Sequence, residues 1–284
     1  MNAPLLSTPR VEPFFFDAVP GTRFSLYHQP CAHLAPRGAI LYVHPFAEEM
    51  NKTRRMAALQ SRAFAAMGFA VLQIDLFGCG DSCGDFHDGR WDLWKHDLAL
   101  AASWLAERTS GLPLHLWGVR LGGLLALDFA SRTQVDNIIL WQPFMSGRAC
   151  INQFLRLRLA SQPEGGVPGA ARSTSALRAQ LAVHGVIEVA GYEVAVPLVK
   201  EIDACDAAHI QLPPCTVHWF AGGADASARA ATSAARLGAR WAADGVTLHF
   251  HRIEPAVPFW CADDITVCPA LLDATGAVFT GDRA

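Results

Sequence analysis

Short apolar segments alternate with longer amphipathic segments along the first half of the chain. The apolar segments predict buried strands at residues 39–43, 69–76, 113–117 and 137–142. Between them, helical apolar spacing predicts helices at residues 53–67, 91–108 and 121–132. Strands that are almost entirely apolar and are separated by helices predict a parallel sheet covered by helices on both faces. Two further strands are predicted ahead of these, at residues 11–19 and 22–29.

The alternation lapses between residues 147 and 212 and returns after them. Residues 147–212 are helical or irregular by pattern, with a small hairpin expected at 186–194 around Ala190-Gly191. Strands at 216–221 and 246–253 then flank a helix at about 227–243. We therefore predict a core made of residues 1–146 and 213–284, interrupted by a cap, residues 147–212, over one end of the sheet. The residues after Pro255 follow no clear pattern.

Composition and charge exclude several classes of protein. The 284 residues are 51% hydrophobic, enough for a large core, and the formal net charge is −3. A general nucleic-acid binder carries a basic excess, so we expect no nucleic-acid partner. No apolar run approaches the roughly 20 residues of a membrane span, and the chain does not begin with a signal-peptide pattern. We expect a cytoplasmic protein that does not span a membrane.

A strand passes directly into a helix at Gly118-Val-Arg-Leu-Gly-Gly123. This spacing of glycines matches the nucleophile elbow of the α/β-hydrolases, G-x-S-x-G, a sharp turn that presents a serine. Side chains at the glycine positions would collide with the neighbouring strand and helix. We therefore predict the α/β-hydrolase fold, with a mostly parallel central sheet, helices on both faces and an inserted cap. Arg120 stands where the nucleophile is expected, and a guanidinium has no lone pair with which to attack a carbonyl.

The remaining members of a Ser-His-Asp triad are sought by their order along the chain. Asp225 follows the strand at 216–221, where the acid is expected. The histidine should follow the last strand, but residues 253–260 contain none, and His249 and His251 lie within the strand itself. Two of the three triad functions are therefore expected to be lost, and serine-hydrolase chemistry with them.

A glycine-rich turn at residues 75–85 contains other reactive side chains. Cys79 and Ser82 could replace the nucleophile, but no base is visible for either. The spacing of Cys79, Cys83 and His87 fits no zinc pattern. We expect no metal and no cofactor, and we expect Asp81 and Ser82 to hold the turn by hydrogen bonds to the backbone.

Several longer motifs resemble a single family. They are His44-Pro-Phe-Ala-Glu-Glu-Met-Asn-Lys-Thr-Arg-Arg-Met56, Asp75-Leu-Phe-Gly-Cys-Gly-Asp-Ser-Cys-Gly-Asp85, Leu116-Trp-Gly-Val-Arg-Leu-Gly122, Trp141-Gln-Pro143, Phe154-Leu-Arg-Leu-Arg-Leu159 and Val189-Ala-Gly-Tyr192. Together they resemble the exosortase A system-associated hydrolase 2 family, whose elbow also carries arginine, although His44 departs from the family pattern. The resemblance implies an α/β-hydrolase fold, a bacterial cytoplasm, and a link to exopolysaccharide production and exosortase-type protein sorting. It implies no substrate.

An arginine in the elbow has two possible uses. Arg120 stands at a helix N-terminus, and the N–H groups of Leu121 and Phe46 could form an oxyanion pair, so the site could bind a carboxylate, a phosphate or an acidic sugar. Alternatively the buried guanidinium is simply paired with a carboxylate. The acids expected nearby are Glu48, Glu49 and Asp225. We expect Phe259 and Trp260 to wall the pocket in place of the missing histidine.

Three functional hypotheses follow from these residues. In the first, the chain binds a small anionic, acyl or sugar ligand, or a partner protein of the polysaccharide machinery, through His44, Phe46, Glu48 and Leu121. In the second, it is an active esterase or thioesterase whose non-standard site uses His44, Glu49 or Asp225 on water, with Arg120 assisting. In the third, it is a purely structural component of an assembly. The fold cannot choose among them.

Overall fold

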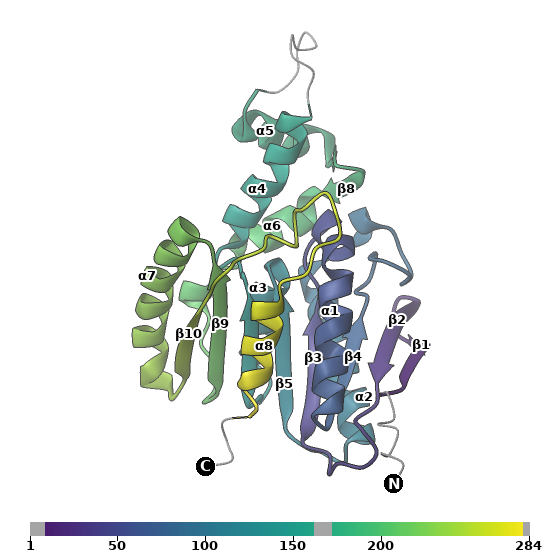
Figure 1. Ribbon diagram of the computed structural model, residues 1–284. Coiled ribbons are helices and arrows are strands. Elements are labelled where there is room, and N and C mark those ends of the chain that lie inside the picture. Colours follow the sequence, from purple (N-terminus) through teal and green to yellow (C-terminus); the bar gives the residue numbers. More distant parts are fainter. Residues whose placement is uncertain (1–8, 162–171, 281–284) are drawn as a thin grey trace.

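An eight-stranded sheet forms the centre of the computed structural model, which describes residues 9–161 and 172–280 (Figure 1). In the order in which they lie side by side, the strands are β1 (Val11–Asp17), β2 (Thr22–His28), β4 (Phe69–Ile74), β3 (Gly38–Val43), β5 (Leu114–Val119), β6 (Asn137–Trp141), β9 (Thr216–Gly222) and β10 (Thr247–Ile253). The pairs β1–β2 and β2–β4 are antiparallel, and all other neighbours are parallel. The predicted mostly parallel sheet is confirmed.

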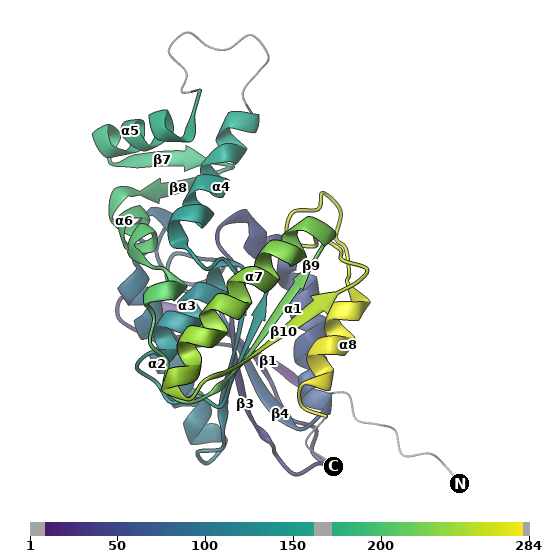
Figure 2. The ribbon, with the colours of Figure 1, turned by 90° about the vertical axis from the view of Figure 1, so that its left-hand side faces the viewer.

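Helices cover both faces of this sheet (Figures 1 and 2). One face carries α1 (Glu48–Ala66) and α8 (Pro269–Ala277), and the other carries α2 (Trp91–Arg108), α3 (Leu121–Ala130) and α7 (Ala224–Trp241). The sequence of β3 is apolar throughout because all six of its residues are buried between the two layers of helices. Leu41 and Val43 enter the core beneath α2 and α3, whereas Ile40 and Tyr42 enter the core beneath α1.

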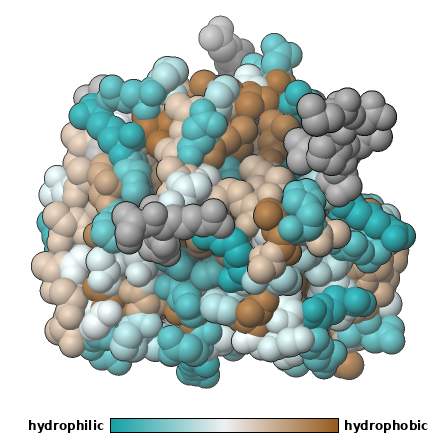
Figure 3. Space-filling view, turned by 60° about the horizontal axis from the view of Figure 1, so that its bottom comes forward, coloured by the Kyte–Doolittle hydropathy of each residue, from teal (hydrophilic) through white to brown (hydrophobic). Residues whose placement is uncertain are grey.

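Residues 147–161 and 172–212 lie over the carboxyl ends of the parallel strands (Figure 1). They form α4 (Gly147–Ala160), α5 (Thr174–His184), the hairpin β7 (Val186–Val189) and β8 (Tyr192–Ala195), α6 (Val196–Ala204) and the short helix η2 (Ala207–His209). Figure 2 shows α5 and the hairpin projecting beyond the sheet, with α4 and α6 closer to it. The side of the molecule away from these elements has hydrophilic and hydrophobic residues intermixed (Figure 3). Within the described ranges, no helix is both long enough and apolar enough to cross a membrane.

Two helices differ from the prediction in ways that affect the site. α1 begins at Glu48 rather than at residue 53, so two glutamates occupy its first turn, where the helix dipole favours negative charge. The residue before the helix, Ala47, has a positive φ of 51° and no capping side chain. The helix α8 lies in the region after Pro255, for which the sequence predicts no element. Its Thr275 Oγ1 accepts a hydrogen bond of 2.9 Å from Nε1 of Trp141, on β6.

Candidate functional site

Arg120 is the single residue between β5 and α3, at the apex of a sharp turn. Its backbone has φ 55° and ψ −120°, a conformation that costs a residue other than glycine on the order of 1–3 kcal/mol. A Cβ on Gly118 would lie 2.5 Å from the Gly122 carbonyl oxygen, and one on Gly122 would overlap backbone carbonyls at the end of β3. The predicted elbow is therefore present, with arginine at its apex.

The Arg120 side chain is buried and paired with Glu49 of α1. Arg120 Nε lies 3.1 Å from Glu49 Oε1 and 3.3 Å from Oε2, and Nη2 lies 3.1 Å from Oε1. The two side chains are only 9% and 11% exposed, so solvent and salt screen the pair weakly. Burial raises the pKa of the Glu49 carboxyl, and the Arg120 guanidinium opposes that rise. The sequence leaves open whether Arg120 binds a ligand or is paired with a carboxylate, and in the structure it is paired with Glu49.

A carbonyl and two aromatic rings complete the surroundings of the guanidinium. Arg120 Nη1 donates to the Gln142 carbonyl oxygen at 3.1 Å. Arg120 Cζ lies 4.2 Å from the ring centroid of Phe144 and 4.9 Å from that of Trp260, distances at which ring faces attract a cation. Of the two aromatic residues predicted to wall the pocket, Trp260 lies beside the Arg120 guanidinium, whereas Phe259 is buried in the core against Trp141. Gln142 and Phe144 were not predicted as site residues. The available signal was their position directly after a parallel strand, at the carboxyl edge where such sheets bind ligands.

A pocket adjoins the Arg120–Glu49 pair, between α1, α4 and the segment after β10. We call it the elbow pocket, and its lining residues are Phe46, Glu48, Glu49, Phe144, Cys150, Gln153, Phe154, Leu157 and Cys261. Glu48 Oε2 is buried there and has no hydrogen-bond partner. Burial raises the pKa of the Glu48 carboxyl. The two neighbouring glutamates therefore differ, because one is neutralised by arginine and the other keeps an unpartnered oxygen.

A second, mainly apolar pocket lies at the predicted oxyanion pair. It is lined by His44, Pro45, Phe46, Ala47, Leu76, Cys79, Phe86, Trp91, Trp94, Leu121, Gly122 and Leu125. Leu121 is the first residue of α3, so its N–H belongs to those that a helix leaves without an internal acceptor. Phe46 separates the two pockets, since it lines both. The walls of this second pocket suit an acyl or other apolar group.

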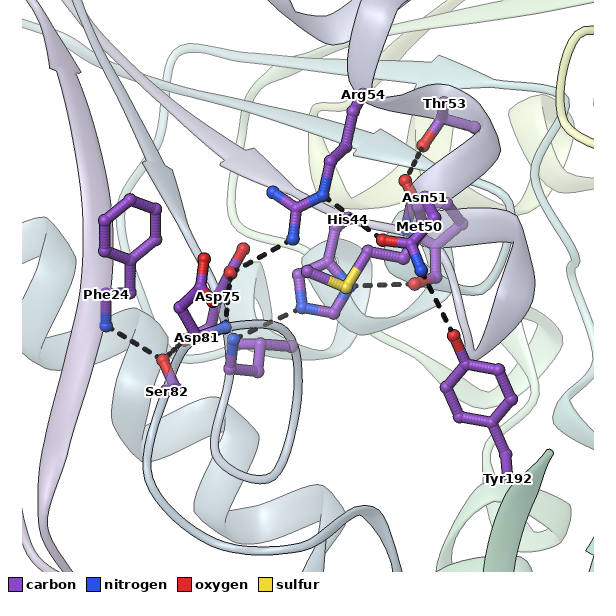
Figure 4. Close-up of polar contacts among 12 residues, drawn as sticks. Phe24, His44, Met50, Asn51, Thr53, Arg54, Asp75, Asp81, Ser82 and Tyr192 are labelled. Atoms are coloured by element: carbon purple, nitrogen blue, oxygen red, sulfur yellow. Dashed lines mark hydrogen bonds and ion pairs between the residues drawn. The ribbon is translucent and has the colours of Figure 1, made fainter. Parts of the chain in front are cut away.

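His44 is held in a hydrogen-bond network rather than left available as a base (Figure 4). Its Nδ1 lies 2.8 Å from the Pro45 carbonyl oxygen, and its Nε2 accepts a hydrogen bond of 3.2 Å from the Leu76 N–H. A neutral ring with the proton on Nδ1 satisfies both contacts. Burial lowers the pKa of His44, which favours this neutral form.

A neighbouring set of hydrogen bonds joins α1 to the turn after β4 and to the hairpin β7–β8. Asp75 Oδ2 accepts from Arg54 Nη2 at 3.2 Å and from the Asp81 N–H at 3.0 Å. Arg54 Nε donates to Asn51 Oδ1 at 3.3 Å, and Asn51 Nδ2 donates to the Tyr192 hydroxyl at 3.4 Å. Figure 4 shows these side chains turned toward one another. The Arg54 guanidinium is therefore engaged in holding α1 against the turn after β4.

Neither alternative nucleophile in the glycine-rich turn is free to react. Ser82 Oγ donates to the Asp75 carbonyl oxygen at 2.5 Å and accepts from the Phe24 N–H at 2.9 Å, so it holds the turn as predicted. The Cys79 thiol is buried, and burial raises its pKa far above the range in which a thiolate forms.

The described residues do not assemble a triad around Arg120. His249 and His251 lie on β10 and His218 on β9, where His218 Nδ1 is 3.1 Å from His251 Nε2. The segment from β10 to α8 contains no histidine. Asp225 falls in the first turn of α7, but its side chain lies outside the described part of the structure.

One group of side chains in the described ranges could share a metal ion. Asp85, His87 and Asp88 have potential ligand atoms within 4.8 Å of one another. These residues already have other partners, since Asp88 Oδ2 accepts from the Asp85 N–H at 3.4 Å and His87 lies 3.6 Å from Glu193. None of these three residues lines the elbow pocket.

Comparison with known protein families identifies the family of this chain. Residues 35–242 match the family described as serine aminopeptidase, S33. The chain belongs to the serine aminopeptidase S33 family. Membership agrees with the fold, yet this S33 protein carries Arg120 where the elbow of a serine enzyme presents its nucleophile. Family membership therefore does not establish a serine-dependent mechanism here.

Curated relatives of this S33 protein are longer than it is. The lysophosphatidylserine lipase ABHD12 of Xenopus tropicalis is 28% identical over 114 residues, which are 38% of this chain and 28% of that protein. The protein ABHD12B of Homo sapiens is 25% identical over 166 residues, which are 51% of this chain and 44% of that protein. The chain thus spans less than half the length of these relatives.

Solved structures similar to this S33 protein confirm the fold. Est1E from Butyrivibrio proteoclasticus, with ferulic acid bound, has a TM-score of 0.61 at 13% identity, covering 94% of this chain and 98% of that chain. The hypothetical protein PA2218 from Pseudomonas aeruginosa has a TM-score of 0.62 at 14% identity, covering 98% and 95%. XC6422 from Xanthomonas campestris, described as an α/β serine hydrolase without lid, has a TM-score of 0.55 at 17% identity, covering 99% and 97%. At such low identities these likenesses show the α/β-hydrolase fold alone.

Proposed function

We propose that this S33-family protein binds a ligand in the elbow pocket and does not perform serine-hydrolase chemistry. The observation that carries the proposal is Arg120 at the elbow apex, with its guanidinium engaged by Glu49 and by the Gln142 carbonyl. A hydrolase of this fold presents a hydroxyl or thiol at that point, next to a histidine. Ligand binding does not depend on either group.

An anion held by Arg120 alone receives less support than the sequence suggested. Glu49 cancels the arginine charge, so an anion would have to displace a carboxylate held by contacts of 3.1–3.3 Å. The apolar walls of the elbow pocket, at Phe46, Phe154 and Leu157, support a ligand with an acyl or other apolar part. Because α4 supplies several of these walls, we propose that residues 147–212 act as a cap over the ligand.

The biological setting is a proposal that rests on the sequence motifs. The His44–Met56 motif and the arginine elbow resemble the exosortase A system-associated hydrolase 2 family. We therefore propose a role in bacterial exopolysaccharide production and exosortase-type sorting, in the cytoplasm, through a small acyl or sugar ligand or through a partner protein of the polysaccharide machinery.

An active esterase or thioesterase is the second candidate, and one observation favours it. Glu48 keeps a buried, unpartnered carboxylate oxygen, and burial raises the pKa of this carboxyl, which makes it a stronger base than an exposed glutamate. A relative of this chain is named a lysophosphatidylserine lipase. In this alternative, Glu48 or Glu49 would activate a water molecule.

Turnover of p-nitrophenyl esters and acyl-CoA thioesters separates the two candidates. We expect no hydrolysis above the buffer rate, with the wild-type protein and Arg120→Ala giving the same background. Hydrolysis that is lost in Glu48→Gln or Glu49→Gln, yet kept in Glu107→Gln, would establish the second candidate and overturn the first. Glu107 is a suitable control because it lies exposed on α2, outside the lining residues of either pocket.

A further inference from the structure

The elbow pocket contains one carboxylate, that of Glu48, that forms no direct ion pair within the described residues. Glu49 is paired with Arg120, but no ion pair to Glu48 is formed within the described residues. Lys52 lies one helical turn further along α1, and its Nζ is directed to the Cys261 carbonyl oxygen at 3.4 Å. Lys52 and Arg120 both lower the pKa of the Glu48 carboxyl, but neither contacts it, so a cationic group that entered the pocket would be its first direct partner.

One oxygen of the half-buried Glu48 carboxyl also lacks the hydrogen bonds that buried carboxylate oxygens normally accept. Its Oε2 is buried without any partner, whereas buried polar atoms in folded proteins almost always have one. Replacing the carboxyl by an apolar group would remove this deficit, so the position is poorly explained by packing alone. A donor that arrives with a ligand would satisfy this oxygen.

Aromatic faces around the carboxylate favour the same kind of ligand. Phe46, Phe144 and Phe154 all line the pocket, and the Phe46 and Phe154 rings meet edge to face with centroids 5.1 Å apart. Phe144 already lies against a guanidinium, that of Arg120, at 4.2 Å. Phenyl faces attract cations, and a carboxylate beside them strengthens that preference.

We propose that the elbow pocket takes a ligand with a protonated amine, an alkylammonium head group that donates to Glu48 while its apolar part lies against Phe46, Phe154 and Leu157. This inference rests on the proposed binding function and names its ligand class. A carboxylate or phosphate head group would meet the Glu48 carboxylate and would find Arg120 already engaged by Glu49. An uncharged head group could donate to Glu48 but would not draw on the ring faces.

Three probes of equal chain length test this class: hexylammonium, hexanoate and 1-hexanol, each titrated calorimetrically into the full chain at pH 7.5. We expect hexylammonium to bind at least tenfold more tightly than either of the others. In Glu48→Gln, which keeps the shape of the side chain and removes its charge, hexylammonium affinity should fall about tenfold, the loss of one charge-assisted hydrogen bond. Glu107→Gln should bind as the wild type does. A thermal melt of each variant checks that it is folded.

A complementary variant tests the role of the arginine. Glu49→Gln releases Arg120 from its carboxylate, so hexanoate affinity should rise severalfold while the hexylammonium preference is reduced. Equal or tighter binding of hexanoate by the wild type, no binding of any probe, or unchanged hexylammonium affinity in Glu48→Gln would each overturn the ammonium assignment. Failure of the proposed binding function would be recognised separately, as ester or thioester turnover that depends on Glu48 or Glu49.

Discussion

Removal of the Arg120 guanidinium should destabilise the protein far more than removal of an exposed arginine. Arg120→Ala would leave the Glu49 carboxylate 11% exposed, without the three contacts of 3.1–3.3 Å that now satisfy it. Breaking a buried ion pair by deleting one partner costs about 3–5 kcal/mol. Alanine does not relieve the positive φ of 55° at this position, so no compensating gain is expected. A fall in Tm of about 10 °C corresponds to this loss.

Urea denaturation followed by tryptophan fluorescence at pH 7.5 measures the effect. Arg120→Ala, Glu49→Ala and the double variant form a cycle whose coupling free energy should be on the order of 2–3 kcal/mol. Arg252→Ala provides the matched control, because Arg252 and Glu254 pair at 2.7 Å but are 57% and 65% exposed, so its loss should be below about 1 kcal/mol. Additive effects at Arg120 and Glu49, or a loss in Arg120→Ala no larger than in the control, would refute a buried pair.

Three further predictions follow from the elbow and from the buried histidines. Arg120→Ser should not create an esterase, because the nearby His44 ring is engaged by the Pro45 carbonyl and the Leu76 N–H, and the described segment from β10 to α8 contains no histidine. Turnover of p-nitrophenyl acetate above the buffer rate would contradict this. Gly122→Ala should destabilise the protein by about 3 kcal/mol or more, since its Cβ would overlap backbone, whereas Gly276→Ala, with nothing within 4 Å, should be neutral or stabilising by up to about 1 kcal/mol in urea titrations. Burial lowers the pKa of three histidines from 6.5 to about 4 in the folded protein. The unfolded chain takes up protons at these positions at a higher pH than the folded protein does, so stability should fall as the pH drops from 6.5 to 4. A urea midpoint that stays constant over this range would exclude these histidines as the cause; they are His28, His115 and His218.

The elbow could be predicted from the sequence because local and overall geometry impose the same requirement. Gly118 and Gly122 must lack side chains since the strand, the helix and β3 meet within contact distance there. The apolar strands on either side place that turn in a parallel sheet. Both signals are present in the order of residues, so the fold follows from them.

The pairing of Arg120 could not be read from the sequence. Glu48 and Glu49 are adjacent, and neighbouring residues on a helix point about 100° apart, so only one can meet Arg120. Which one does so depends on where α1 begins. The apolar pattern places that start too late, at residue 53, because Ala47 is not a capping residue type and the first turn, Glu48–Asn51, is mostly polar.

The surroundings of Arg120 also depend on segments that lack periodic patterns. Trp260 lies in an irregular stretch between β10 and α8, and Phe144 lies in the turn after β6. Neither position has a helical or strand period from which its direction could be inferred. Phe144 comes near Arg120 because β6 lies beside β5 in the sheet, whereas Trp260 does so because the segment after β10 crosses back toward α1 before α8 begins (Figure 1).

The most direct test of the central claim is intact-protein mass spectrometry after incubation with a fluorophosphonate, which forms a covalent adduct with an activated serine. The arginine apex, the engaged Ser82 hydroxyl and the engaged His44 ring together predict an unchanged mass. A stoichiometric adduct mapped to one serine would show that the protein retains a working nucleophile, and would contradict the account.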